Sequence, residues 1–360
     1  MTHPTTHDPP TARQAIRFRL SRLAATLALW MLAIFAWAWS LGFTHSLDDY
    51  FPVWIAKSLV IAIGIGIPWG WIGFRRSRPW LPAILLSLTF GACVLGNQFV
   101  RPSHDRTWST AQAILPYADI DLGRSPTITV HNIRSNRYGP IAPSHKSHYD
   151  DTYDLSKLRS VWLGVDRFTS LEPMAHTFLS FEFEPGSHRS NFLAFSVETR
   201  RESDEPNYSP IRGLFKNYEL IYVIADEQDV LAGRSDDVEN IIQLYPIRTT
   251  PEGIRSLFLD MLDRTNSLRE QPEFYHTLFN NCTNNIVQHT NCVIEQSISP
   301  WARGVVFPGY TDSLAHQRGI IDTELSLDDA RIRFRIDERV KSYDGLSDFS
   351  EFIRAQRPQR

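Results

Sequence analysis

The sequence predicts an α+β domain that follows three membrane-spanning helices. Three long uncharged, mostly apolar runs lie near the N-terminus, at 23–43, 58–74 and 79–100. Beyond them, short segments rich in aromatic and β-branched residues predict strands, and two later segments with apolar residues at helical spacing predict helices. We therefore divide the chain into a cytoplasmic segment (1–22), a membrane anchor (23–100), a connector (101–125), a folded domain (126–325) and a charged, partly disordered tail (326–360).

Each of the three apolar runs is long enough to cross a bilayer, which needs roughly 20 residues per helix. The second run extends back to about Val53 if the ammonium group of Lys57 reaches the interface. A cleaved secretory signal is the alternative for the first run, but its apolar core exceeds the usual ~7–15 residues, and two further spans follow. No Asp or Glu lies within the spans, which favours anchoring over transport.

The short loops predict the orientation in the membrane. Arginines 13, 17, 19 and 22 precede the first span, and the RRSRP loop at 75–79 separates the second from the third. The intervening loop, THSLDDYFP, has neither Lys nor Arg. Because positively charged loops stay in the cytoplasm, we expect a cytoplasmic N-terminus in a bacterial inner membrane and a periplasmic C-terminal domain.

Charge gives no reason to expect a nucleic-acid partner. Lys and Arg total 37 and Asp and Glu total 40, for a net charge of -3. His145 and His148 form an H-x-x-H pair before Asp150 and Asp151, yet no compact ligand set is visible, so we interpret this turn-rich stretch as a solvated loop without a metal. We expect no cofactor, and the oligomeric state is not indicated.

The predicted sheet begins after the connector. Strands are expected at 127–133, 160–168, 174–183, 191–201, 218–227 and 238–247, and the turn EPGSHRS predicts that the third and fourth form an antiparallel hairpin. The segment 136–160 is predicted to be a loop. Helices are expected from Pro251 and over 282–295, with one more short helix within FPGYTDSLAHQRGIID.

The stretch LFNNCTNNIV places Cys282 between two asparagine pairs, where the last long helix begins. Asn281 and Thr283 are residue types that cap helix starts. A thiol in the first helical turn lies at the positive end of the helix dipole, which stabilises a thiolate. Unpaired backbone N–H groups there can hold a developing oxyanion. The pattern therefore favours a nucleophilic cysteine.

A disulfide is the structural alternative, because the predicted compartment is oxidising. On one continuous helix, Cys282 and Cys292 would lie about 15 Å apart, whereas a disulfide needs Cα atoms within roughly 7 Å. Only a broken helix would allow the pair to form. The remaining cysteine, Cys93, lies in the third span and is expected to be an inert buried thiol.

A nucleophilic cysteine needs a base. His176 is the best candidate, because it lies in the hydrophobic strand MAHTFLSFEF; the alternative is a half-buried histidine with satisfied hydrogen bonds. His276, shortly before the cysteine, is the competitor. On the neighbouring strand, Glu198 shares a face with Ser196 and Arg200 and could accept the second imidazole N–H. It could equally pair with Arg200 or Arg201.

The combination AHTFLSFEF, FSVETRRE, GLFKNYELIYVIADEQDV and YHTLFNNCTNNI, in that order, resembles the N-terminal periplasmic domain of Lnb-type lipoprotein N-acyltransferases over roughly Ile128 to Gly319. That family is similar to the papain-like NlpC/P60 superfamily, in the circularly permuted branch. The resemblance implies a papain-like antiparallel sheet with helices. It also implies Cys282 as nucleophile and His176 as base, with Glu198 and Arg200 in support.

The functional expectation is a thiol acyltransferase that moves an acyl chain from a phospholipid, through a Cys282 thioester, to a lipoprotein amine or a similar acceptor. Asn281, Thr283 and Arg200 are the predicted substrate-binding residues. The membrane spans precede the domain here, whereas those of Lnb-type enzymes are expected after it, which leaves the acceptor open. The alternatives are an NlpC/P60-like hydrolase of a cell-wall amide or lipid ester, and a non-catalytic tethered binding domain.

Overall fold

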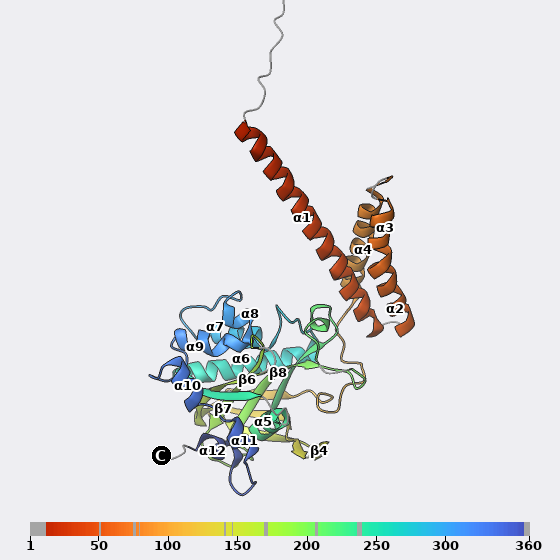
Figure 1. Ribbon diagram of the computed structural model, residues 1–360. Helices are drawn as coiled ribbons and strands as arrows, with labels where there is room; N and C mark the ends of the chain where they lie inside the picture. The colour runs from red at the N-terminus through yellow and green to blue at the C-terminus, as the bar shows by residue number, and fades with distance from the viewer. Residues whose placement is uncertain are drawn as a thin grey trace, which may run out of the picture. The chain divides into compact units, whose positions relative to one another are not determined.

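The computed structural model describes residues 12–49, 52–74, 77–78, 80–139, 142–145, 147–168, 172–205, 208–235 and 240–355 (Figure 1). The chain divides into two compact units, Met1–Arg101 and Pro102–Arg360. The first unit is built of helices, and the second contains the described strands.

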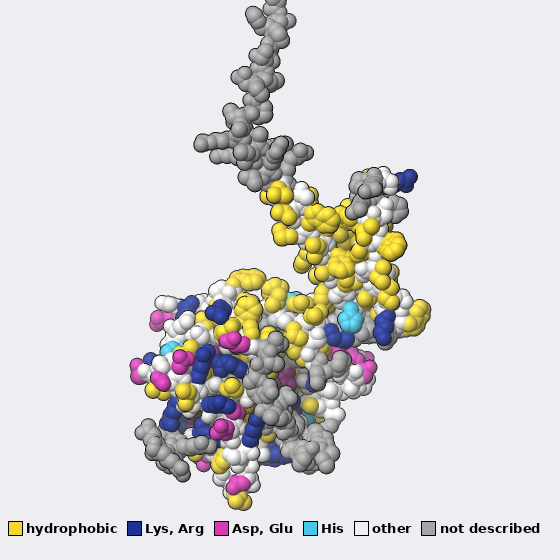
Figure 2. All heavy atoms as spheres, viewed as in Figure 1, with side chains coloured by type: hydrophobic (Ala, Val, Ile, Leu, Met, Phe, Trp, Pro, Cys, Tyr) yellow, Lys and Arg dark blue, Asp and Glu magenta, His cyan; other side chains and the backbone are white. Residues whose placement is uncertain are grey.

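Three helices of the first unit are long and apolar enough to cross a membrane, as expected, over Leu23–His45, Trp54–Gly73 and Trp80–Phe99. Figure 2 shows them covered with hydrophobic side chains. Arg75 and Arg76, on which the predicted orientation partly depends, lie outside the described residues. The helices are α1 (Ala12–His45), α2 (Val53–Ile61) and α3 (Ile67–Phe74), which are joined by the π-helical turn Ala62–Gly66 (η2), and α4 (Trp80–Phe99); the short 3-10 helix Ser46–Asp49 (η1) follows α1.

The second unit is built on a sheet in which eight strands are described. Seven follow the order β1-β2-β9-β8-β7-β6-β10, and β5 pairs with β2. Neighbours are antiparallel except β2 and β9, which meet in parallel at Arg134 and Ala225, so the predicted antiparallel-dominated α+β fold is confirmed. The strands are β1 (Tyr117–Asp121), β2 (Thr127–Arg134), β5 (His148–Asp154), β6 (Leu158–Arg167), β7 (Ala175–Phe183), β8 (Phe192–Arg200), β9 (Glu219–Asp226) and β10 (Ile241–Pro246).

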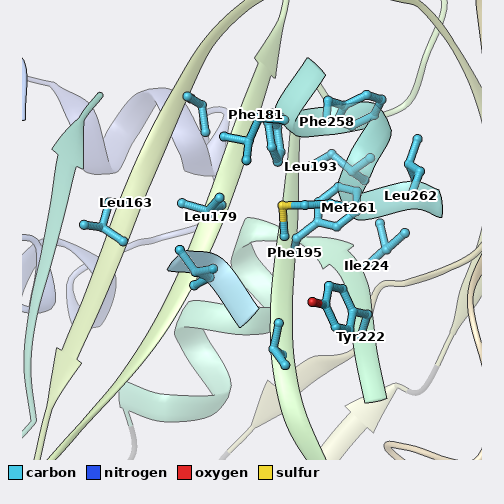
Figure 3. Close-up of a cluster of buried hydrophobic side chains, with 14 of the residues drawn as sticks. Leu163, Leu179, Phe181, Leu193, Phe195, Tyr222, Ile224, Phe258, Met261 and Leu262 are labelled. Carbon is cyan, nitrogen blue, oxygen red and sulfur yellow. The ribbon is translucent and has the colours of Figure 1, made fainter. Parts of the chain in front are cut away.

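One face of the sheet is covered by α6 (Pro251–Glu270) and α7 (Cys282–Asn291). Helix α6 begins where the sequence predicts, because the Thr250 side chain accepts a hydrogen bond from the Gly253 amide and proline occupies the first turn. Its buried Phe258 lies edge-to-face against Phe181 and Phe195 of the sheet, at ring distances of 5.0 and 5.6 Å (Figure 3). Each such fully buried side chain contributes about 1.5–3 kcal/mol to stability.

The opposite face is covered by α5 (Glu227–Ser235), α11 (Asp337–Lys341) and α12 (Phe349–Arg354) (Figure 1). The prediction of a partly disordered tail from 326 is wrong for the described residues up to 355. Ile336, Val340, Phe349 and Ile353 are buried against this face, while most of the charged side chains between them are exposed. The exception is Asp337, which is buried and pairs with Arg335 at 2.7 Å. The high average charge hid a regular apolar pattern.

The predicted loop at 136–160 is also wrong in part. Strand β5 pairs along most of β2 and buries Tyr153 completely. The shorter strands β3 (Arg137–Gly139) and β4 (Ala142–His145) form a separate pair, and the 3-10 helix Leu155–Lys157 (η3) follows β5.

Helix α7 ends at Asn291, short of the predicted 295. The remaining short helices are α8 (Arg303–Val306), α9 (Thr311–Gln317) and α10 (Leu327–Arg333), together with the 3-10 helices Arg212–Leu214 (η4) and Pro308–Tyr310 (η5).

Candidate functional site

Cys282 is the first residue of α7, and the asparagines around it cap that helix. The Asn281 side-chain oxygen accepts a hydrogen bond from the Asn284 amide at 2.9 Å, and the Asn284 side chain accepts one from the Asn281 amide at 3.2 Å. The Asn281 side chain also donates to the Thr277 carbonyl at 2.7 Å. This reciprocal cap fixes the start of α7 at the cysteine, as the NNCT pattern predicts.

The other two asparagines of the motif join α7 to the strands beneath it. The Asn285 side chain donates to the Asn280 side chain and to the Asn281 carbonyl, both at 2.8 Å, and accepts from the Tyr222 hydroxyl at 3.0 Å. That hydroxyl also lies 2.8 Å from Nε2 of His289. The asparagine-rich motif therefore holds the helix tip in place through side chains of which three, those of Asn281, Asn284 and Asn285, are buried.

His176 lies near the start of β7, with its ring buried. Its Nε2 is 2.8 Å from the Ser196 hydroxyl on β8, and Ser196 donates to Oε1 of Glu198 at 2.8 Å. Glu198 in turn accepts from the Gln112 side chain at 3.3 Å and lies 4.0 Å from the Arg134 guanidinium. Glu198 is thus connected to the imidazole through Ser196, whereas the sequence left open a direct bond to the imidazole or a pair with Arg200 or Arg201.

Cys282 and His176 line the same pocket, which has a volume of about 500 Å³. Helix α7 is fastened to β7 beside it, because the hydroxyls of Thr283 and Thr177 lie 3.1 Å apart in the buried interface. The described residues that line the pocket are Gln112, Asp166, Phe168, Met174, Ala175, His176, Val197, Glu198, Thr199, Arg201, Tyr208, Asn240, Tyr275, Thr277, Leu278, Asn281, Cys282, Val306, Phe307 and Pro308.

Two features of this pocket are missing from the sequence prediction. Asp166 lies directly opposite His176 in the β6–β7 ladder and is completely buried. Burial raises the pKa of the Tyr275 phenol well above its ordinary value, and the electrostatic interaction with the neighbouring Cys282 raises it further. Burial also raises the pKa of the Tyr208 phenol. A charged residue inside the apolar strand SVWLGVDRF was the available signal for Asp166.

Of the three predicted substrate-binding residues, only Asn281 is among the described residues that line the pocket. Asn281 lines the pocket, but its side chain is engaged in the helix cap. Thr283 is buried between α7 and β7, and Arg200 holds the connector, so neither is among the described lining residues. The Arg200 guanidinium donates to the Gln112 and Ala113 carbonyls and lies 4.1 Å from the Trp108 ring. Burial lowers its pKa to about 10.

His276, the competing base, lies in the turn before α7 and is not among the described residues that line the pocket. Its Nδ1 accepts from the Leu278 amide at 3.2 Å, and its ring stacks on Phe279. Cys282 and Cys292 are both free thiols at opposite ends of one unbroken helix, so the disulfide alternative is excluded. Across the described residues, no three His, Cys, Asp or Glu side chains cluster as metal ligands would; the His145 side chain lies outside the described part.

Comparison with known proteins identifies one family. Residues 145–312 match the model of the Lnb N-terminal periplasmic domain, a range that contains His176, Ser196, Glu198 and Cys282. No curated protein and no solved structure matches the chain. The match begins at the predicted loop before β5 and ends in α9, so it includes every residue of the hydrogen-bonded chain around the imidazole except Gln112 and Arg134.

Proposed function

Since residues 145–312 form an Lnb N-terminal periplasmic domain, we propose that this membrane-associated periplasmic protein is a thiol-dependent acyltransferase. The observation that supports the proposal most directly is that Cys282, at a helix start, and His176, at a strand start, line one pocket. Glu198 and Ser196 orient the imidazole in this proposal. The anchor crosses a bacterial inner membrane with its N-terminus in the cytoplasm.

In the first step, the Cys282 sulfur attacks the carbonyl carbon of a phospholipid ester as His176 takes the thiol proton. Because Nε2 is engaged with Ser196, Nδ1 is the nitrogen that accepts it. The new S–C bond forms, the ester C–O bond breaks, and the imidazolium returns its proton to the departing lysolipid oxygen. The backbone amides of Cys282 and Thr283, at a helix terminus where such groups lack an intrahelical partner, hold the oxyanion.

In the second step, an amine such as a lipoprotein N-terminus attacks the thioester carbonyl. His176 takes the proton that the nitrogen loses, an amide C–N bond forms, and the C–S bond breaks to release Cys282. Water in place of the amine gives a free fatty acid. Three preceding apolar helices keep the domain beside its lipid substrate, which raises the effective substrate concentration.

Hydrolysis of a cell-wall amide, the chemistry of NlpC/P60-like enzymes, is the second candidate. The polar part of the pocket wall, with Asp166, Glu198, Arg201 and Asn240, suits a hydrated peptide stem. The full-length chain should be incubated with phospholipid vesicles and, separately, with peptidoglycan fragments, and the products identified by mass spectrometry. A lysolipid together with a Cys282 thioester supports acyl transfer. A cleaved stem peptide with unchanged lipid would contradict acyl transfer and support cell-wall hydrolysis.

A Cys282→Ser variant is the matched test of the nucleophile, because it removes the thiol and keeps a side chain of similar size. We expect no acyl-thioester in this variant, and persistence of activity would end the proposal. Reactivity toward iodoacetamide near neutral pH tests the non-catalytic alternative, in which Cys282 is merely packed and resists the reagent. Cys292 is exposed and would react on its own, so this measurement needs a Cys292→Ser background.

A further inference from the structure

Five large apolar side chains are exposed around the mouth of the pocket. Ile211 is 63% exposed, Phe279 57% and Trp301 72%, and Leu278 and Phe307 are 42% and 46% exposed. We refer to these five side chains as the apolar rim. Exposed apolar groups that gather at one place mark an interaction surface more often than scattered ones do.

The members of the rim come from three segments that contact one another. The Thr277 amide donates to the Gly213 carbonyl at 3.0 Å and its hydroxyl to the Pro210 carbonyl at 2.7 Å. These bonds join the segment that carries Ile211 to the segment that carries Leu278. The rings of Phe279 and Trp301 pack edge-to-face at 5.8 Å. Figure 2 shows hydrophobic side chains gathered on the side of the domain that carries α7 and α8.

The rim is continuous with the candidate catalytic pocket. Leu278 and Phe307 line that pocket together with Cys282. Leu278, Phe279 and Trp301 also line an adjoining groove of about 190 Å³ that runs along α7. Among the described residues that line the groove, none carries a charge. A ligand that reaches the cysteine across this rim would meet apolar surface.

Covalent connectivity places a membrane within reach of this end of the sheet. Helix α4 ends at Phe99, and the Ser103 amide already donates to Glu219 at the start of β9, at 3.2 Å. Four residue steps span at most about 14 Å. Glu219 also pairs with Phe274, which shortly precedes Leu278 in the chain. The chain itself therefore sets an upper limit of about 14 Å on the separation of Phe99 and Ser103.

We propose that the apolar rim docks on a phospholipid bilayer, with Phe279 and Trp301 inserted at the level of the headgroups. Tryptophan and other aromatic residues favour that interfacial region, because their rings are apolar and their edges polar. Docking would open the pocket with Cys282 directly to lipid. Only this catalytic benefit rests on the proposed function; the docking itself does not.

Fluorescence labelling of the full-length chain in phospholipid nanodiscs tests the docking. In a Cys282→Ser, Cys292→Ser background, Phe279→Cys and Trp301→Cys carry an environment-sensitive NBD label, and Leu346→Cys, at an 89% exposed apolar position, is the matched control. We expect a blue-shifted emission at 279 and 301 that doxyl-labelled phospholipids quench, and neither effect at 346. Labels at 279 and 301 that behave like the one at 346 would overturn the proposal. So would a blue shift without doxyl quenching, because that result indicates a protein partner.

Activity provides a second and separable readout. Replacing Phe279 and Trp301 by serine should lower the turnover of phospholipid in nanodiscs by about 10-fold or more, because each aromatic ring contributes to interfacial binding. Turnover of a water-soluble short-chain ester should stay within about 2-fold, since the rim does not take part in the chemistry. Equal losses on both substrates would contradict docking. If the wild type cleaves neither substrate, the proposed function fails, while the label experiment still decides the docking.

Discussion

The Ser196 hydroxyl lies 2.8 Å from Nε2 of His176 and links that imidazole to Glu198. A serine hydroxyl can bridge two polar groups, because it donates one hydrogen bond and accepts others. Since it donates to the Glu198 carboxylate, it accepts at Nε2 and thereby selects the tautomer in which Nε2 carries the proton. In that tautomer Nδ1 carries no proton, which is the form that the proposed base role requires.

The Ser196→Ala substitution tests this link. Without the hydroxyl, the imidazole loses the partner that sets its tautomer, so we expect the rate of thioester formation to fall by about 10-fold, less than the roughly 10²–10⁴-fold loss when a general base is removed altogether. Single-turnover kinetics on the full-length chain measures it. In the same assay, Ser196→Ala combined with Glu198→Gln should be no slower than Ser196→Ala alone, because both act through one connection. Additive losses would show that Glu198 reaches the site by another route.

The Asn281→Ala substitution tests the helix cap. Loss of the capping side chain should lower the free energy of unfolding by about 1 kcal/mol and slow thioester formation, because the helix tip that holds Cys282 frays. Ser326→Ala is the matched control: Ser326 caps α10 by accepting from the Asp329 amide. It should cost a similar amount of stability and leave activity unchanged. Equal activity in the two variants would show that the Asn281 cap does not affect thioester formation.

The buried carboxyl of Glu219 predicts a pH-dependent stability. Burial raises its pKa to about 7, although Arg106 at 3.1 Å acts in the opposite direction. Between about pH 4.5 and pH 7 the native state therefore holds a proton that the unfolded chain releases, so the stabilising contribution is complete at low pH and is lost as the pH rises through 7. Glu219→Gln should abolish this component, on the order of 1–3 kcal/mol.

Urea unfolding of the full-length chain in detergent across this pH range measures the effect. Glu273→Gln is the control, and its effect on the pH dependence of stability should have the opposite sign. The hydrogen bonds from Arg264 lower the pKa of Glu273, whereas burial raises that of Glu219. Its contribution is present at neutral pH and is lost on acidification. If Glu219→Gln follows the wild-type profile, the Glu219 carboxyl is ionised across the range.

The C-terminal helices are expected to be part of the folded core. Ile353→Ala leaves a cavity in the packing on the second face of the sheet and should cost about 2–5 kcal/mol. Leu346→Ala, at an exposed position between α11 and α12, should stay within about 0.5 kcal/mol of the wild type. Thermal or urea denaturation compares them. A negligible effect of Ile353→Ala would instead support the sequence prediction that the tail is partly disordered.

Much of the sheet could be predicted from the sequence, because its strands are apolar enough to show a clear pattern. Strand β5 was not predicted, because HYDDTYD contains three aspartates and Tyr153 is its one fully buried residue, so the alternation of apolar and polar residues is weak. The tail escaped for a related reason: its few apolar residues are dispersed among charges, and only their helical spacing reveals that one face is buried.

At the site, unusual residues in their local context singled out Cys282 and His176, and the structure places both in the lining of one pocket. What the sequence could not provide was how neighbouring segments cover each face. Strand alternation put Glu198 and Arg200 on the same face, but residues 104–113 fold over that face and bind the Arg200 guanidinium. The sequence analysis therefore predicted that Arg200 binds substrate, whereas in the structure its guanidinium binds carbonyl groups of the connector.

The attachment of residues 103–106 to the sheet has a practical consequence for work without the membrane helices. A soluble fragment cut at 126 would contain Glu219 and Glu202 without Arg106, and Arg200 without the carbonyls that its guanidinium binds. The buried side chains of Arg200 and Glu219 would then lack these partners, at a cost of several kcal/mol. A fragment that begins at Pro102 keeps these interactions and is the one to express for crystallisation.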